Sequence, residues 1–146
     1  MEPLTAGAIA IGTVIATKAL EKTGEKVGET LWNKTGEFLV TLKKHSPHTV
    51  VAIEKAPSQP LDYGKAVLEV ESVAKAHPQV NLAVQELVAA AQANPPLNLA
   101  DALKEIKAAV EKSQHPDAPA FIQNIQKAIN AAQTQTIDQR NSTFNI

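Results

Sequence analysis

Apolar residues recur every three to four positions in successive segments of this chain, and prolines separate those segments. This spacing places apolar side chains on one face of a helix, and proline does not fit inside a helix beyond its first turn. No alternating strand pattern occurs before residue 134. The sequence therefore predicts an all-α fold, a helical bundle of about five to six helices with a long N-terminal helix.

The expected helices have recognisable starts and ends. Ser46 followed by Pro47 is typical of a helix start and predicts a short helix to Lys55, and the proline-rich residues 56–60 are the clearest linker. Aromatic residues are only 3% of the chain, so its core must be aliphatic. Four further helices are predicted by apolar stripes over 63–74, 80–91, 99–110 and 121–129, the last two capped by Asn98 and Asp117.

Charge and cysteine content narrow the range of functions. The chain has 14 basic and 15 acidic residues and a net charge of -1. It lacks the basic excess that is typical of nucleic-acid-binding proteins. Since it has no cysteine, it can form neither disulfides nor thiolate metal sites, which suits a reducing cytosol. We expect a cytosolic protein with no nucleic-acid partner.

No residue pattern predicts an enzyme. The four histidines lie beside proline-marked breaks, and the pair His45 and His48 has no third metal ligand at a suitable spacing. Acidic pairs such as Glu69 and Glu71 are typical of a solvated helix face. The chain contains neither a nucleophile elbow nor a glycine loop that could hold phosphate. We therefore expect no catalytic residue, no metal and no cofactor.

The residues from Pro3 to Thr17 carry no charge and form the most apolar stretch of the chain. As a helix they span about 22 Å, which is short of the roughly 30 Å hydrocarbon core of a bilayer. A secretion signal would need basic residues ahead of the apolar stretch, where only Glu2 is charged. The segment therefore predicts neither a permanent membrane span nor a signal peptide, but a helix at the border of membrane competence.

The helical pattern is expected to continue from Pro3 to about Lys44, with charges and glycines in its middle. Lysines at 18, 22 and 26 and glutamates at 21, 25 and 29 predict two stripes of opposite charge. Glycines four residues apart allow helices to approach closely. Either this long helix packs tightly within the bundle, or it exchanges bundle contacts for contacts with copies of itself. The residues for such packing are Gly24, Gly28, Trp32 and Gly36.

Residues 133–146 differ from the rest of the chain. The helical period stops near Ala132, and the last six residues are uncharged, free of proline and glycine, and compatible with β-structure. One interpretation is a flexible polar tail. The other is a segment that stacks in cross-β ladders, for which the candidates are Ile137, Asn141, Phe144 and Ile146.

The apolar start from Met1 to Gly12, followed by the charged helix with its glycines, resembles the bacterial Bell domain. This family is the counterpart of fungal HeLo and HeLo-like domains and of the four-helix bundle of the mixed-lineage kinase domain-like protein. The resemblance covers about residues 1–132. It implies a cell-death effector, a latent bundle that forms homo-oligomers and permeabilises the plasma membrane.

The resemblance also implies which residues act. In the family the N-terminal helix carries the membrane activity, and a C-terminal amyloid signalling motif is templated by a receptor protein with a matching motif. Residues 141–146 look like the beginning of such a motif, although the family's motifs run to about 20 residues and the chain stops at Ile146. The membrane-inserting residues would be Leu4, Ile9, Ile11, Val14, Ile15 and Leu20.

The expected function is therefore a pore-forming effector, cytoplasmic when latent and at the inner (plasma) membrane when active. Its expected partners are the lipid membrane, copies of itself and the receptor. The alternative is a soluble helical adaptor without membrane activity. In that case Leu4 to Leu20 would be the buried central helix of the bundle.

Overall fold

The computed structural model describes the backbone of residues 3–22, 24, 27–55, 62–96, 98–113 and 118–144, and the side chains of 4–22, 24, 27–55, 62–96, 98–112 and 119–132. Within these ranges the chain forms seven helices and no strand, so the all-α prediction is confirmed. The helices are α1 (Pro3–Lys22), α2 (Glu29–Lys43), α3 (Pro47–Lys55), α4 (Tyr63–Ala76), α5 (Pro78–Ala93), α6 (Leu99–Ser113) and α7 (Ala118–Phe144).

The expected single helix from Pro3 to about Lys44 is two helices, and that prediction is wrong. Between α1 and α2, Gly24 has a φ of +83°, in the left-handed region that glycine adopts at little cost. Its amide donates to the Glu21 carbonyl at 3.1 Å, closing a turn at the end of α1. This break is the reason that the described helices exceed the predicted number.

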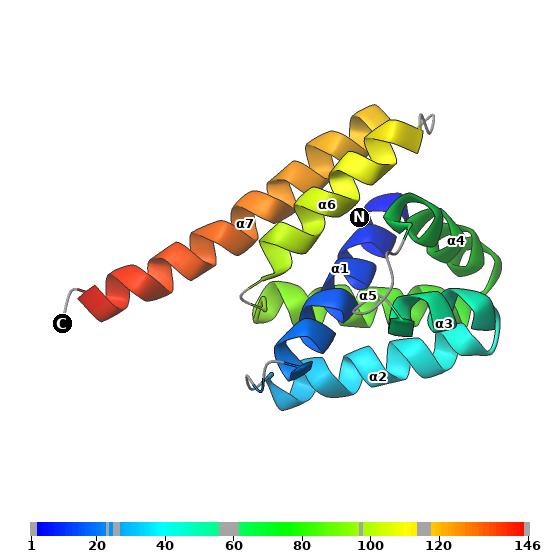
Figure 1. Ribbon diagram of the computed structural model, residues 1–146, viewed down its shortest axis with the longest axis horizontal. Helices are drawn as coiled ribbons and strands as arrows, with labels where there is room; N and C mark the ends of the chain where they lie inside the picture. The colour runs from blue at the N-terminus through cyan, green and yellow to red at the C-terminus, as the bar shows by residue number, and fades with distance from the viewer. Residues whose placement is uncertain are drawn as a thin grey trace.

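The bundle is arranged around α1 (Figure 1). Helices α4, α5, α6 and α7 all contact α1, α2 packs along α5, and α6 pairs with α7. The short α3 packs against both α2 and α4. As predicted, the core is aliphatic, with Phe38 and Phe121 as its only fully buried aromatic side chains among the described residues.

Most predicted helix boundaries are confirmed, although their caps differ. Helices α3 and α5 begin at prolines, as expected. The buried Ser46 hydroxyl pairs with the Thr49 hydroxyl at 2.8 Å and donates to Glu69 Oε1 at 3.2 Å. Asn98 precedes α6, but its side-chain oxygen is buried without a hydrogen-bond partner. The expected cap Asp117 and the linker 56–60 lie outside the described residues.

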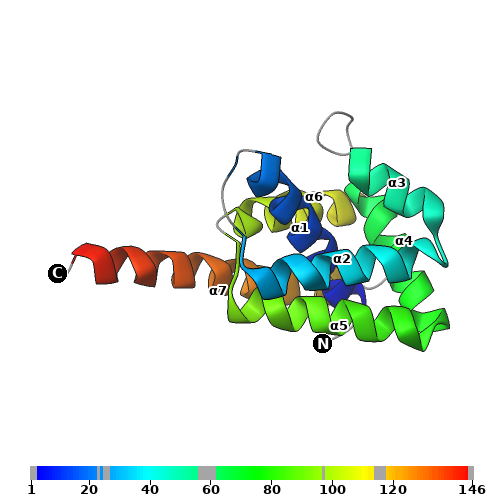
Figure 2. The same ribbon diagram turned by 90° about the horizontal axis from the view of Figure 1, so that it is seen from below.

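The last helix, α7, is longer than the sequence predicts. Its buried residues Phe121, Ile125, Ile129 and Ala132 face the bundle, and Lys107 of α6 donates to Gln126 at 2.9 Å. The helical backbone then continues to Phe144 and projects away from the other helices (Figures 1 and 2). The prediction that the helix ends near Ala132 is therefore wrong. The loss of apolar period does not end the helix, because residues 133–144 contain neither glycine nor proline to stop it.

Candidate functional site: the central N-terminal helix

Helix α1 carries no charge before Lys18, and this uncharged part is enclosed by the bundle. Every residue from Leu4 to Val14 is buried, which is the expected environment for a helix without a polar face. The residues predicted for membrane insertion therefore lie in the core and do not form an exposed apolar face. They are the fully buried Leu4, Ile9, Ile11 and Val14 and the partly buried Ile15 and Leu20.

Two glycines of α1 face neighbouring helices, and at one of them the neighbour packs closer than a side chain would permit. A Cβ atom on Gly12 would lie 2.9 Å from Leu103 Cδ2 of α6, which is closer than real contacts permit. A Cβ on Gly7 would lie 3.4 Å from Val70 Cγ1 of α4, in ordinary contact. The sequence analysis did not single out these two positions. The signal was the small-residue composition of the segment, which permits close approach but does not say toward which helix.

The polar side chains of α1 are threonines, and they are also buried. The Thr13 hydroxyl donates to the Ile9 carbonyl four residues earlier at 2.7 Å, so this group is satisfied within the helix itself. Thr17 Oγ1 is buried and has no hydrogen-bond partner. A buried hydroxyl without a partner costs about 1–3 kcal/mol, so Thr17 weakens the packing of the end of α1.

A cavity of about 190 Å³ lies beside α1, where α5, α6 and α7 meet. Its lining is mostly apolar and includes Ile9, Leu99, Leu103 and the small residues Ala128 and Ala132. Side chains that border empty space lose dispersion contacts.

The four residues predicted to pack helices together do not share one helix face. Gly24 lies in the turn and Gly28 at the N-cap of α2, so the expected glycine pair on a helix is wrong. A Cβ on Gly28 would lie 3.2 Å from Asn94 Nδ2, whereas a Cβ on Gly36 would meet nothing within 4 Å. Trp32 is 45% exposed on α2.

The predicted charge stripes also end where α1 ends. Lys18, Glu21 and Lys22 belong to α1, whereas Glu29 opens α2. Glu25 and Lys26 lie outside the described residues. A single helix with two continuous stripes of opposite charge is therefore not what the chain forms.

Polar residues around α3 hold α3 to its neighbours. The rings of His45 and His77 stack with their centroids 3.8 Å apart, and His48 Nε2 lies 3.6 Å from Glu69 Oε1. Among the residues that the structure describes, no group of three or more histidine or acidic side chains could hold a metal ion. His45, His48 and His77 therefore have contacts that a structural role explains, and His115 lies outside the described residues.

The predicted tail residues fall at the limit of the described chain. Ile137, Asn141 and Phe144 lie in the helical backbone of α7, their side chains are outside the described set, and Ile146 is outside it altogether. The cross-β hypothesis for this segment stays a prediction. It requires the end of α7 to exchange a helical backbone for an extended one.

In the described part of the chain, one helix is long and apolar enough to cross a membrane. It runs from Leu4 to Lys22, and 72% of its most apolar stretch is buried in the bundle. Comparison of the chain with protein-family models, curated proteins and solved structures found no match. Helix α1 and its surroundings are therefore the features of this chain that bear on its function.

Proposed function

We propose that this protein is a latent membrane-permeabilising effector whose central helix α1 leaves the bundle and enters a lipid bilayer. It is cytoplasmic when latent, and at the inner (plasma) membrane it acts as a homo-oligomer. The resemblance to the Bell domain motivates this proposal. The observation that carries it is that α1 is apolar all round, has no charge before Lys18, and is long enough to span a bilayer.

The length of the helix favours membrane entry. The uncharged segment spans about 22 Å, but the complete α1 has 20 residues and is about 30 Å long, which matches the hydrocarbon core. Its charged residues Lys18, Glu21 and Lys22 gather at one end. Lysine side chains at a helix end can reach the headgroup region while their aliphatic stems stay in the apolar phase.

The free energy of moving α1 from the bundle into lipid depends mainly on the helices that α1 uncovers. Moving α1 from the protein core to lipid replaces one apolar environment with another, so its own hydrophobic stabilisation changes little. The Thr13 hydroxyl is already bonded within the helix, which lowers the cost of placing it in lipid. The main cost is the exposure of the apolar faces of α4, α5 and α6, which self-association or lipid would have to cover.

The trigger in this proposal is the C-terminal segment. A receptor with a matching motif would gather several copies through residues 133–146 and raise their local concentration. The projection of the end of α7 from the bundle makes this segment accessible to such a partner (Figure 1).

One observation favours a second candidate function, a soluble helical adaptor. The burial of α1 is what the central helix of any soluble bundle requires, with or without membrane activity. In this case α1 stays in place, and partner proteins bind the outer helices. The two functions differ in whether α1 must move.

A disulfide between α1 and α4 tests the movement directly. Gly7 and Val70 suit this design, because a Cβ on Gly7 would lie 3.4 Å from Val70 Cγ1, near the position that the sulfur of a cysteine introduced at residue 70 would take. The chain has no cysteine of its own to interfere. We expect the oxidised Gly7→Cys, Val70→Cys protein to lose dye release from anionic liposomes, and reduction to restore it.

The single variants Gly7→Cys and Val70→Cys are matched controls, and both should release dye under oxidising and reducing conditions. Equal dye release from the oxidised and the reduced double variant would refute the release of α1 from the bundle. A wild-type protein that releases no dye at any concentration would favour the adaptor. The disulfide tests the release of α1 more directly than Ile11→Asp would. Ile11 is fully buried, so a charge there would unfold the bundle.

A further inference from the structure

The outer face of α2 carries apolar residues that no other described helix covers. Trp32 is 45% exposed and Val40 is 62% exposed, and Gly36 lies between them at the four-residue spacing of one helix face. The opposite face of α2 packs on the bundle through Leu31, Phe38 and Leu42. Seen from below, α2 lies at the front of the molecule with its outer face free (Figure 2).

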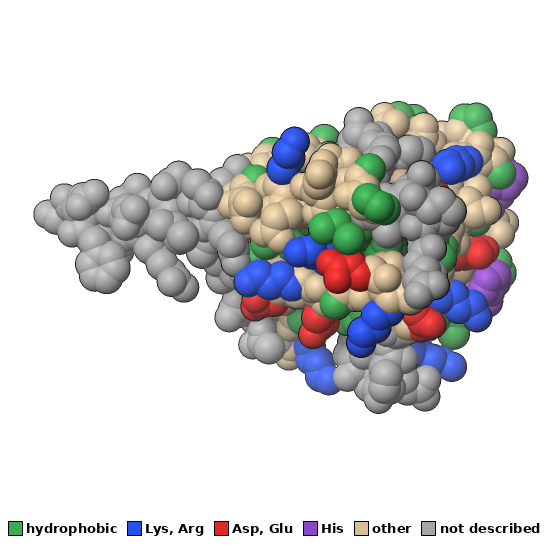
Figure 3. Space-filling view, turned by 90° about the horizontal axis from the view of Figure 1, so that it is seen from above, with side chains coloured by type: hydrophobic (Ala, Val, Ile, Leu, Met, Phe, Trp, Pro, Cys, Tyr) green, Lys and Arg blue, Asp and Glu red, His purple; other side chains and the backbone are tan. Residues whose placement is uncertain are grey.

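An exposed tryptophan at such a place is unusual. Tryptophan buries a large area when it is covered and is enriched among residues that dominate binding energy. On the opposite side of the molecule, positive and negative side chains lie among apolar and polar ones (Figure 3). The outer α2 face is formed by Glu29, Trp32, Gly36, Val40 and Lys43.

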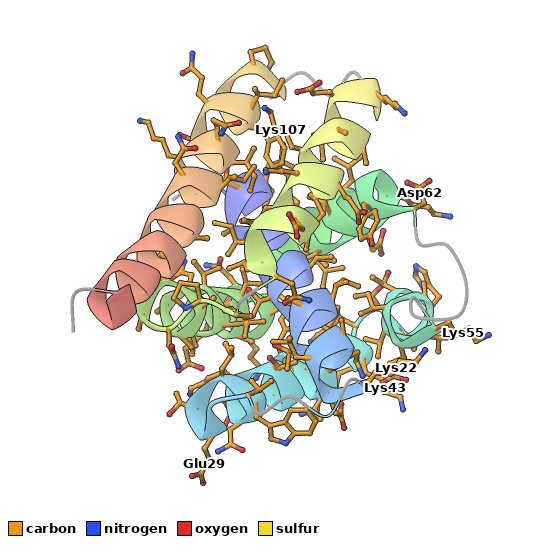
Figure 4. The ribbon with its side chains drawn as sticks, turned by 60° about the vertical axis from the view of Figure 1, so that its left-hand side comes forward. Lys22, Glu29, Lys43, Lys55, Asp62 and Lys107 are labelled. Carbon is orange, nitrogen blue, oxygen red and sulfur yellow. The ribbon has the colours of Figure 1, made fainter. Side chains whose placement is uncertain are left out.

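The order of residues along this face is symmetric about Gly36. Trp32 lies four residues before Gly36 and Val40 four residues after it, and Glu29 and Lys43 lie seven residues before and after it. Figure 4 shows Glu29 and Lys43 near opposite ends of α2. If a second α2 crosses antiparallel at Gly36, each Trp32 meets the partner's Val40 and each Glu29 faces the partner's Lys43.

The charges support this arrangement over a parallel one. Within the described part of the chain, neither Glu29 nor Lys43 forms an ion pair, whereas Lys34 on the flank of α2 already contacts Glu37 and Glu86. An antiparallel pair would place opposite charges together at both ends, and a parallel pair would place like charges together. Opposite charges across an interface select its register.

Gly36 explains how two such helices could approach. A Cβ at this position would meet nothing within 4 Å of its own chain, so packing within the bundle does not require a glycine there. A glycine inside an exposed helix costs about 1 kcal/mol relative to alanine. At the crossing point of two helices, however, a missing side chain lets the backbones come close enough for the flanking Trp32 and Val40 to interlock.

We propose that the outer α2 face is a self-association surface, on which two copies of this chain pair antiparallel about a two-fold axis through Gly36. The same patch of both copies forms the contact, as a two-fold interface requires. This inference specifies the self-association that the proposed function needs, but it does not depend on membrane activity. A single pair of helices buries a small area, so the dimer is weak and forms at high protein concentration.

Reversing the charge of Glu29 or Lys43, in buffer without lipid, tests the antiparallel register of the two α2 helices. Sedimentation velocity should show the wild type passing from monomer to dimer as its concentration rises. Glu29→Lys and Lys43→Glu should each weaken association about tenfold, because each places two like-charge contacts in the dimer. The double variant Glu29→Lys, Lys43→Glu should restore association to within about threefold of the wild type, since it exchanges the two signs.

A cysteine introduced at residue 36 tests the position of the two-fold axis by disulfide crosslinking. Gly36→Cys places two thiols at the crossing point and should form a covalent dimer rapidly under mild oxidation. Thr30→Cys is the matched control on exposed α2 surface, because two copies of residue 30 would lie about 18 Å apart along the helix pair. Circular dichroism of each variant should match the wild type.

Two results would overturn the proposal. The first is a wild type that stays monomeric at all concentrations together with equal crosslinking of the Gly36→Cys and Thr30→Cys variants. The second is an association that the single charge reversals leave unchanged, which would place the contact elsewhere. Both measurements use no lipid, so their failure is distinguishable from a failure of dye release.

Discussion

At the scale of residues, the end of α1 contains a polar group that its surroundings do not satisfy. Thr17 is fully buried, and its hydroxyl has no hydrogen-bond partner. By contrast, the Thr13 hydroxyl one turn earlier is bonded to the Ile9 carbonyl. The two threonines therefore contribute differently to the stability of the folded bundle.

We predict that Thr17→Val stabilises the folded protein by about 1 kcal/mol, because valine has the same shape and removes the unpaired polar group. The midpoint of thermal unfolding should rise by about 2–4 °C. Thr13→Val is the matched control and should not stabilise, since it removes a satisfied hydroxyl. If both changes have the same effect, the difference in hydrogen bonding between the two sites has no energetic consequence.

The phenol of Tyr63, at the start of α4, gives the folded protein a pH-dependent stability that can be tested. Partial burial, followed by the nearby Glu105 carboxylate, raises the pKa of the Tyr63 phenol above 10.0. The phenol is therefore harder to ionise in the folded state than in the unfolded state. The stability linked to this shift is present below pH 10 and is lost as the pH rises through the folded-state pKa.

The chain has one tyrosine, so its ionisation can be followed by ultraviolet absorbance. We expect a titration midpoint above that of the unfolded protein in denaturant. Glu105→Gln should lower the midpoint toward 10 without abolishing the shift, because the contribution of burial remains. An unchanged midpoint in this variant would mean that Glu105 does not act on the phenol.

At the scale of elements, the break between α1 and α2 decides the architecture. Gly24 has a positive φ and open space around it, so its requirement for glycine comes from backbone conformation. Gly36 has equally open space but lies within a helix. The same substitution at these two glycines should therefore have opposite effects.

Gly24→Ala should destabilise the protein by about 1–2 kcal/mol, because an L-residue strains in the left-handed region. Gly36→Ala should stabilise it by up to about 1 kcal/mol through helix propensity. Urea unfolding of the two variants in parallel measures both values, in dilute solution where self-association is absent. Stabilisation by Gly24→Ala would contradict the turn at this position.

At the scale of the whole molecule, the bundle and the end of α7 are separable. Among the side chains that the structure describes, the buried residues of α7 run from Phe121 to Ala132, and the helical backbone beyond them projects from the bundle (Figure 1). We predict that a chain ending at Ala132 folds with a thermal midpoint within about 4 °C of the full chain, a change of about 1 kcal/mol or less. Circular dichroism measures this midpoint. A truncated chain that fails to fold would show that residues 133–146 are part of the domain.

The fold was largely predictable because its helices are bounded by local chemistry. Prolines at 47 and 78 and the apolar stripes of α4, α5 and α6 act through backbone geometry and side-chain period, which need no knowledge of the rest of the chain. The two errors, at the α1–α2 break and at the end of α7, have another origin. At the first, Gly24 ends the helix through its left-handed backbone conformation and not through close packing with another helix. At the second, the backbone stays helical to Phe144 although the apolar period stops near Ala132.

For the candidate site, the sequence alone determined that residues 3–17 are apolar and that they form a helix. Only the tertiary structure decided that this helix is enclosed by α4, α5, α6 and α7, with Gly12 where α6 leaves no room for a side chain. The physical reason is that an apolar helix without a polar face is equally favourable in a protein core and in lipid. Its composition favours removal of the helix from water, and the surrounding helices provide that environment in the folded bundle.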